Sequence, residues 1–161
     1  MRRILKLVGY AAAALLAVLT LVLFFRGEPL GPIPGRELSG EVVSEPIAEW
    51  DFSDGYRTVA GETRPGRPHS VTTVCFVHEG QLYVPASDGA DKRWARYVLD
   101  DPRVRLKVGD RIYPGRATRV TDEALRGALI EAARGKYPRI VGEMDDEALA
   151  RIWVFRVDSA P

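Results

Sequence analysis

The chain has 161 residues and a formal net charge of +1, with 46% hydrophobic and 28% charged residues. Four basic residues (Arg2, Arg3, Lys6 and Arg26) and no acidic ones precede residue 27, which leaves 19 basic against 22 acidic residues, or −3, in the rest. This balance argues against a basic nucleic-acid-binding surface. About 120 residues remain after the N-terminal segments, which is the size of one compact domain.

The N-terminal segment, residues 1–26, is predicted to be a membrane anchor. Nineteen consecutive residues from Leu7 to Phe25 carry no formal charge, and as a helix they would extend about 28 Å, close to the ~30 Å hydrocarbon thickness of a bilayer. The alternative is a cleaved signal peptide, which has a shorter apolar core of roughly 7 to 15 residues followed by small residues. The run ends instead in Phe24, Phe25 and Arg26, which favours an uncleaved single-pass helix.

Charge bias across this run predicts its orientation. Arg2, Arg3 and Lys6 on the N-terminal side outweigh Arg26 and Arg36 on the other. Because positive residues beside a membrane helix tend to stay on the cytoplasmic side, we expect the N-terminus in the cytoplasm and the C-terminal domain outside the cell (inner) membrane.

A linker and one domain are expected to follow the anchor. Residues 27–36 include three prolines and three glycines, a composition that sustains neither a helix nor a central strand. We therefore assign residues 27–37 to a semi-extended spacer and residues 38–161 to the folded domain.

The domain is predicted to consist mainly of β-strands. Stretches rich in β-branched and aromatic residues, or alternating in polarity, indicate six strands: Tyr56–Glu62, Val71–His78, Gln81–Ala86, Arg103–Val108, Arg111–Val120 and Arg151–Val157. Glu79-Gly80 and Gly109-Asp110 predict tight hairpin turns between neighbouring strands. The last strand is apolar on both faces and should be covered on both sides.

Two strands have features that bear on their position. Pro114 cannot donate a ladder hydrogen bond, so its strand is expected near a sheet edge. Arg103, Arg105 and Lys107 share one face of their strand, and we interpret them as a solvated face. Helices are predicted at 91–99, after an Asp122 N-cap, and at 146–150. Strands in hairpins with inserted helices indicate an antiparallel barrel or curled sheet, a mainly β (α+β) fold.

The cysteine and histidine residues indicate neither a reactive thiol nor a metal site. Cys75 is the only cysteine, and its apolar neighbours indicate a small buried hydrophobe rather than a reactive thiol. His69 and His78 are the only histidines, and no cysteine or carboxylate cluster accompanies them at ligand spacing. We therefore expect no metal site.

The stretch from Gln81 to Val120 resembles the flavin and deazaflavin split-barrel proteins, which include pyridoxamine-phosphate-oxidase-like proteins and deazaflavin-dependent nitroreductases. Three parts occur in the same order: the strand Leu82–Ser87 (LYVPAS), a short basic helix with Lys92, Arg93 and Trp94, and the Asp101-Pro102 start of the next strand. Many deazaflavin members also carry a Gly-Arg-x-Ser-Gly turn, where this chain has residues 64–70 (RPGRPHS).

The resemblance implies a six-stranded antiparallel split β-barrel with two or three flanking helices, commonly a homodimer. It also implies that FMN or a deazaflavin binds in a groove, with its phosphate held by basic and hydroxyl side chains. The residues at the corresponding positions are Arg57, Thr73, Ser87, Lys92 and Arg93. The catalytic residues stay unknown, because the ring system itself would perform the hydride chemistry.

Two functions remain open. The first is a membrane-anchored flavin- or deazaflavin-dependent reductase of small molecules, similar to the nitroreductases. The alternative is a cofactor-free binding or structural module of the cell envelope that keeps the barrel fold.

Overall fold

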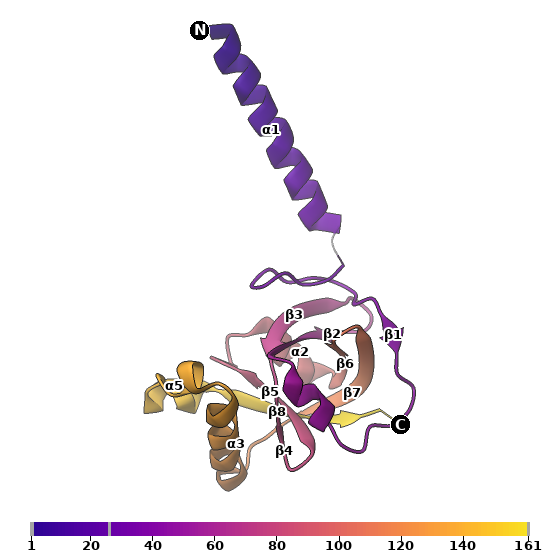
Figure 1. Ribbon diagram of the computed structural model, residues 1–161, viewed down its shortest axis with the longest axis vertical. Helices are drawn as coiled ribbons and strands as arrows, with labels where there is room; N and C mark the ends of the chain where they lie inside the picture. Colours follow the sequence, from indigo (N-terminus) through magenta and orange to yellow (C-terminus); the bar gives the residue numbers. More distant parts are fainter. Residues whose placement is uncertain (1, 26, 161) are drawn as a thin grey trace.

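The computed structural model of the chain describes residues 2–25 and 27–160, with only the backbone at residues 2–5, 7 and 22–25. Helix α1 (Arg2–Phe25) stands apart from a curled sheet with short helices around it (Figure 1). The helical conformation expected for residues 7–25 is confirmed. Both ends of the predicted anchor, Met1 and Arg26, lie outside the described residues. Among the described residues, no helix combines the length and apolarity needed to cross a membrane.

One sheet of eight strands forms the domain, in the order β3-β2-β6-β7-β8-β5-β4, with β1 beside β7. The neighbours pair antiparallel, except for the parallel β1–β7 pair. The strands are β1 (Glu41–Val42), β2 (Thr58–Thr63), β3 (His69–Val74), β4 (Phe76–His78), β5 (Gln81–Ala86), β6 (Arg103–Val108), β7 (Arg111–Arg119) and β8 (Trp153–Ser159). The predicted mainly β, antiparallel fold is confirmed, although the sheet has more than the six strands expected.

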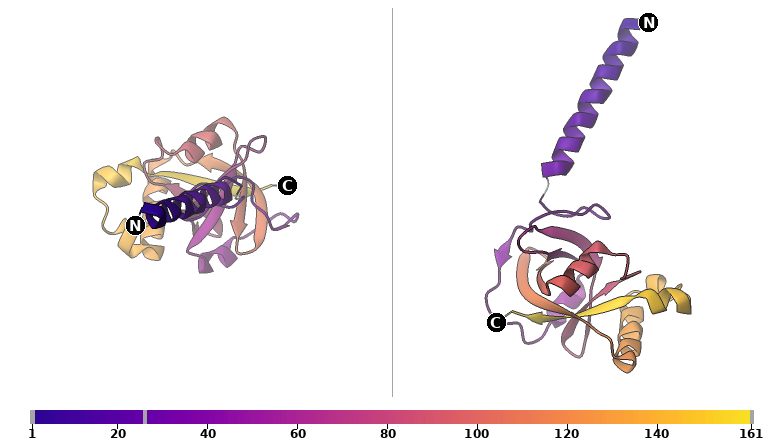
Figure 2. Two further views of the ribbon diagram at one scale, coloured as in Figure 1. Left: turned by 90° about the horizontal axis from the view of Figure 1, so that it is seen from above. Right: turned by 180° about the vertical axis from the view of Figure 1, so that it is seen from behind.

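Five short helices accompany the sheet: η1 (Asp51–Gly55), α2 (Arg93–Asp100), α3 (Glu123–Lys136), α4 (Pro138–Val141) and α5 (Asp146–Arg151). Seen from behind, α2 lies across the barrel, whereas α3 and α5 form a group at one side (Figure 2). Asp122 caps α3 as predicted, because its Oδ1 accepts a hydrogen bond from the Leu125 amide at 2.7 Å.

The strand expected over residues 71–78 is two strands, because the chain changes partners at Cys75. Val74 pairs with Thr58 of β2, whereas Phe76 pairs with Tyr83 of β5. The carbonyl of Cys75 thus leaves the ladder, and it accepts a hydrogen bond from the Tyr137 hydroxyl at 2.6 Å. The side chain of a distant residue therefore satisfies the carbonyl that is left unpaired at the break. No local pattern in the sequence could indicate this contact.

The expectation that the Pro114 strand lies near an edge is wrong. Strand β7 is central, between β6 and β8. Its pairing with β1 ends at Ile112 and its pairing with β8 begins at Gly115. Pro114 occupies the gap, where only its carbonyl is used, accepting from the Ala160 amide at 3.0 Å. The missing N–H of Pro114 is tolerated inside the sheet because Pro114 lies between the part of β7 that pairs with β1 and the part that pairs with β8.

Two apolar cores lie on opposite faces of the sheet. Phe155 and Val157 of β8 face the barrel interior with Trp50, whereas Val154 and the preceding Ile152 face Leu129 and the helices α3–α5. The alternation along β8 places its side chains in both cores. This arrangement confirms that the last strand is covered on both sides.

The segment before β1 is fastened to the barrel by charged side chains that were expected to be solvated. Lys107 contacts Glu28 at 2.5 Å, and its side chain is only 17% exposed. Arg105 donates to the buried Glu62 carboxylate at 3.0 Å, and Glu62 also accepts from the Leu38 amide at 2.6 Å. The stripe predicted as a solvated face thus holds residues 28–38 on the sheet, although Arg103 remains exposed.

We expect Glu62→Gln to lower the free energy of unfolding by about 2 kcal/mol, because it removes a charged acceptor that both Arg105 and the Leu38 amide use. Glu41→Gln is the matched control. Its ion pair with Arg111 is exposed, so its loss should cost no more than about 0.5 kcal/mol. Urea denaturation of both variants measures the difference, and equal effects would contradict the role given to Glu62.

Candidate functional site

A cluster of basic side chains surrounds Tyr97, where α2 meets the tip of the β2–β3 hairpin. The guanidinium carbon of Arg64 lies 4.5 Å from the Tyr97 ring centroid. The ring of His69, the first residue of β3, approaches Tyr97 edge-on with 5.5 Å between centroids. Arg93 lies one helical turn before Tyr97 and therefore on the same side of α2. These four residues are called the Tyr97 cluster.

Positive charge in the Tyr97 cluster is not balanced by nearby carboxylates. Among residues 2–25 and 27–160, neither Arg64 nor Arg93 forms an ion pair with an acidic side chain. Desolvation, followed by the fields of Arg93 and Arg64, lowers the pKa of His69. The cluster therefore holds two guanidinium groups without a carboxylate partner, whose charge disfavours protonation of the imidazole beside them and which together can receive an anion.

The backbone of Arg64 is held in an unusual conformation. Its φ of 59° lies in the left-handed region, which is uncommon for residues other than glycine. The Arg64 carbonyl accepts from the Arg67 amide at 2.8 Å and so closes the turn. Strain of this kind persists where the surroundings impose it, and it often marks functional positions. Here it places the Arg64 side chain over Tyr97.

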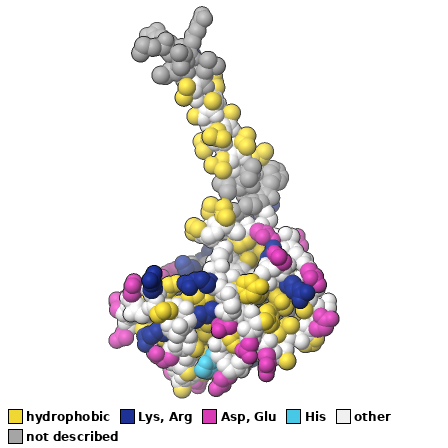
Figure 3. Space-filling model, viewed as in Figure 1, with side chains coloured by type: hydrophobic (Ala, Val, Ile, Leu, Met, Phe, Trp, Pro, Cys, Tyr) yellow, Lys and Arg dark blue, Asp and Glu magenta, His cyan; other side chains and the backbone are white. Residues whose placement is uncertain are grey.

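Helix α2, which carries Arg93 and Tyr97, lies on the side of the barrel that faces the viewer when the molecule is seen from behind (Figure 2). Figure 3 shows the opposite face, where Lys and Arg side chains lie among Asp and Glu side chains.

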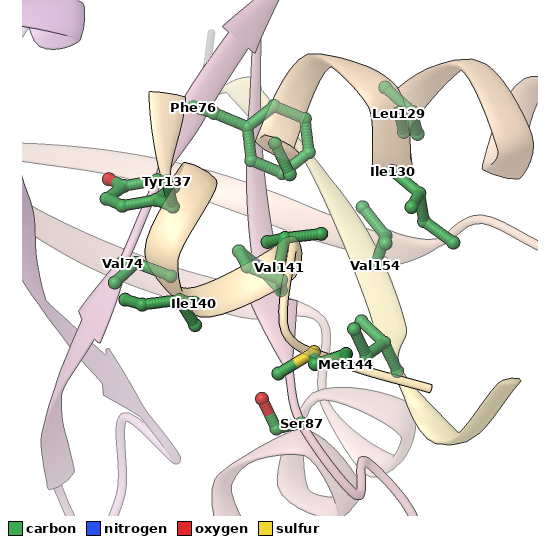
Figure 4. A pocket seen from close by; sticks show the side chains of 13 residues that line it. Val74, Phe76, Ser87, Leu129, Ile130, Tyr137, Ile140, Val141, Met144 and Val154 are labelled. Atoms are coloured by element: carbon green, nitrogen blue, oxygen red, sulfur yellow. The ribbon is translucent and has the colours of Figure 1, made fainter. Parts of the chain in front are cut away.

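An apolar cavity lies on the outer face of the sheet, beneath α3 and α4 (Figure 4). Its walls include Val74, Phe76, Leu129, Ile140, Met144 and Val154, and Ser87 lies at one end beside Met144. The enclosed volume is about 40 Å³. Since one water occupies roughly 10 to 15 Å³ on this scale, the cavity holds a few waters and not a tricyclic ring.

The cover of this cavity is lightly built. Helix α4 has four residues, of which only Val141 is buried, and Met144 lies in the irregular segment that follows it. Segments with few buried apolar contacts open locally at low free-energy cost. Displacement of α4 and this segment would leave the sheet pairing intact, because neither belongs to a strand.

Two protic groups near the cavity are unsuited to proton transfer. The Tyr137 hydroxyl donates to the carbonyls of Arg57 and Cys75 at 2.7 and 2.6 Å, and burial raises the pKa of Tyr137 to about 12. Burial also raises the pKa of the fully buried Cys75 thiol to about 11. Cys75 is thus a small buried hydrophobe, as predicted.

The predicted cofactor residues are divided between two regions. Lys92 precedes α2 and Arg93 opens it, so these two lie together. Ser87 lines the apolar cavity, and Thr73 on β3 donates to the Pro85 carbonyl at 3.4 Å inside the barrel. Arg57 precedes β2, and its guanidinium lies over Tyr137 at 5.9 Å.

Arg57 is far from the other basic residues of the predicted set. It lies at the start of β2, whereas Arg64 follows the end of that strand, and a six-residue strand is about 17 Å long. One phosphate therefore cannot contact Arg57 and Arg93 together. Sequence reasoning did not select Arg64 or His69, although a basic turn between two predicted strands was a usable signal.

The sequence matches the family model of F420H(2)-dependent quinone reductases over residues 58–153, more than half of the chain. None of the curated proteins compared with it matches. Among solved structures, it is similar to a putative pyridoxamine 5'-phosphate oxidase from Listeria innocua, with 15% identity, a TM-score of 0.52, and coverage of 69% of this chain and 90% of that one.

Two further structures share the fold. The F420-H2-dependent reductase FDR-A has 24% identity and a TM-score of 0.51, covering 63% of this chain and 94% of that one. A structure described as a domain-swapped dimer has 23% identity and a TM-score of 0.51, covering 63% and 80%. At these identities the structural likeness extends to the fold alone, which is a split barrel.

The depressed pKa of His69 predicts a pH dependence of stability. An unfolded chain has a His69 pKa near 6.5 and therefore binds more protons than the folded chain just below that pH. The free energy of unfolding should fall as the pH drops from 6.5 toward the folded-state pKa. His69→Gln should remove this dependence, as measured by urea denaturation across the pH range.

NMR titration of the His69 ring tests the electrostatic cause directly. Arg93→Ala should raise the His69 pKa, whereas Arg156→Ala, the same loss of charge on β8, should leave it unchanged. A His69 pKa that is the same in Arg93→Ala and in the parent chain would contradict the arrangement of the Tyr97 cluster.

Proposed function

This chain belongs to the F420H(2)-dependent quinone reductase family, a split-barrel family that binds flavins or deazaflavins, and we propose that it is a deazaflavin-dependent reductase of small molecules. The observation that carries the proposal is the pair of guanidinium groups without a carboxylate partner, Arg64 at the tip of the β2–β3 hairpin and Arg93 at the start of α2. Anionic ligands are bound where charge-assisted donors lack an internal partner.

The described residues fit the anionic part of such a cofactor. Arg64, Lys92 and Arg93 would receive its phosphate, and the neutral His69 could add a hydrogen bond. Partial protonation of His69 on anion binding would increase the positive charge at the cluster. FMN also carries a phosphate, so it is the natural competitor in binding experiments.

The apolar cavity would admit the ring system only after it widens. An enclosed volume of about 40 Å³ excludes it in the present arrangement. We propose that displacement of α4 and of the Met144 segment widens the cavity, so that the ring contacts Ser87 and apolar side chains such as Ile140. These segments would then exclude water from the ring when they return.

When bound and reduced, the deazaflavin supplies a hydride to the substrate. The protein's contribution is to bind, orient and shield. The Tyr137 hydroxyl keeps its proton because its pKa is about 12, and it stays bonded to two backbone carbonyls. An apolar cavity wall favours apolar substrates over charged ones.

A cofactor-free envelope module is the second candidate, and the small size of the enclosed cavity favours it. In that case the Tyr97 cluster would bind another anion or none. Cofactor titration separates the two candidates, because a reductase must bind the deazaflavin.

We also propose that α1 is a single-pass membrane anchor, with the N-terminus in the cytoplasm and the barrel outside. The uncharged run extends from Leu7 to Phe25, of which the side chains of residues 8–21 are described. Apolar side chains such as Val8 and Leu15 are more than 60% exposed. A helix that is apolar all round and not covered by protein is typical of a membrane segment.

A homodimer is a further proposal. One similar structure is a domain-swapped dimer, and strand β4 ends the sheet after only three residues. A second copy would cover part of this edge, which reduces the exposed backbone.

Arg93→Ala should weaken binding of the deazaflavin cofactor about tenfold or more, because one charge-assisted hydrogen bond is lost. Arg111→Ala is the matched control, since it removes an exposed arginine of β7 that pairs with Val108, at the end of β6 away from Thr63. Absorbance titration of the full chain in detergent measures both constants. Equal affinities would remove the Tyr97 cluster from the cofactor site, and no binding by the parent chain would favour the cofactor-free module.

Deletion of residues 1–26 should move the chain from the membrane fraction to the soluble fraction, because the apolar run is lost. The proposed topology predicts that Glu131→Cys, at an exposed site on α3, reacts with a membrane-impermeant maleimide in intact spheroplasts. Reaction only after lysis would show that the barrel lies in the cytoplasm, opposite to the proposed topology. An intact mass that lacks the first residues would support the signal-peptide alternative instead.

A further inference from the structure

Two apolar side chains project from a short loop between α1 and the barrel. Leu30 is 61% exposed and Ile33 is 42% exposed. They flank Gly31 and Pro32 in a stretch, residues 29–35, that carries no charge. Residues 30–33 are called the Leu30 finger.

The Leu30 finger is a hairpin closed by backbone hydrogen bonds. The amide of Leu30 donates to the Ile33 carbonyl and the amide of Ile33 to the Leu30 carbonyl, both at 3.0 Å. Gly31, with a φ of 54°, supplies the left-handed conformation that a tight turn requires. The turn therefore fixes both apolar side chains at its tip.

The base of the finger is fastened to the barrel on both sides. Before the finger, Glu28 contacts Lys107 and the Ser39 hydroxyl. After it, Gly35 exchanges two backbone hydrogen bonds with Ser70 of β3, at 2.8 and 3.1 Å. A Cβ on Gly35 would lie 2.5 Å from the backbone of residues 27–29, so the two arms of the loop cross in close contact. The finger thus keeps its position relative to the sheet.

The finger lies at the foot of α1, on the side of the barrel that faces the helix (Figures 1 and 2). Leu30 follows Phe25, the last residue of α1, by five positions, which allows a span of at most about 17 Å. A bilayer's headgroup region is roughly 5 to 7 Å thick on each side. If α1 crosses the bilayer, Leu30 cannot be far from the lipid surface.

We propose that the Leu30 finger inserts into the lipid surface next to α1, so that the barrel is docked on the membrane in one orientation. This inference rests on the proposed anchor. Apolar side chains on an uncharged loop enter the interfacial layer without desolvation of charge. The contacts of Glu28 and Gly35 would transmit that contact to strands β6 and β3, and thus orient the Tyr97 cluster relative to the membrane.

The test uses the full chain reconstituted in vesicles of phosphatidylcholine and phosphatidylglycerol. Leu30→Cys and, separately, Ile33→Cys carry an environment-sensitive dye. Cys75 is fully buried with a thiol pKa of about 11, so the parent chain should remain unlabelled. Glu123→Cys is the control, because α3 lies at the end of the domain away from α1 (Figure 1).

The dyes at positions 30 and 33 should be blue-shifted, quenched by headgroup-level nitroxide lipids, and several-fold less accessible to aqueous iodide than the dye at position 123. Equal iodide quenching at all three positions, in a chain that floats with the vesicles, would contradict insertion of the Leu30 finger but not anchoring by α1. Protection from iodide without quenching by the lipids would mean that protein covers the finger, which also overturns the proposal. A chain that does not float with vesicles overturns the anchor and the finger together.

Discussion

The buried carboxylate of Glu62 is the interaction on which the arrangement of this molecule depends. At 3% exposure it receives hydrogen bonds from Arg105 of β6 and from the backbone of Leu38. It thus joins two strands of the barrel to the segment before β1. A charged group is stable at such burial only when its partners remain in place. The segment around Leu38 is therefore held on the barrel by a buried interaction.

This clamp determines what the β2–β3 hairpin can do. Glu62 lies two residues before Arg64, and Ser70, which pairs with Gly35, follows His69 directly. The same hairpin thus carries the Tyr97 cluster at its tip and the base of the Leu30 finger on its flank. In the proposed function, the cofactor's anionic group would then bind on the membrane-facing half of the barrel, while the apolar cavity beneath α3 and α4 lies away from it. Substrate and cofactor tail would approach from different sides.

Local patterns in the sequence predicted much of this fold. The turns Glu79-Gly80 and Gly109-Asp110 form hairpins as expected, and Asp122 caps its helix. These features depend on residues adjacent in the chain, whose chemistry is readable from spacing alone. The resemblance to split-barrel proteins agreed with the family to which the chain belongs.

Features that depend on distant partners could not be predicted. The break at Cys75 is tolerated because Tyr137, 62 positions later, satisfies its carbonyl. Arg105 and Lys107 were interpreted as solvated because their acidic partners lie 43 and 79 positions away. For the candidate site, the hairpin tip and α2 are also remote in sequence, so the proximity of Arg64, His69 and Arg93 emerges only when the sheet curls.

The central claim is that the unpaired guanidinium groups around Tyr97 receive the anionic part of a deazaflavin. The most direct measurement is a structure of the full chain with bound F420. The account predicts phosphate oxygens within about 3 Å of the Arg64 or Arg93 guanidinium nitrogens, with the ring beside Ser87. A phosphate bound at Arg57, at the other end of β2, or a barrel that stays empty at saturating cofactor, would contradict it.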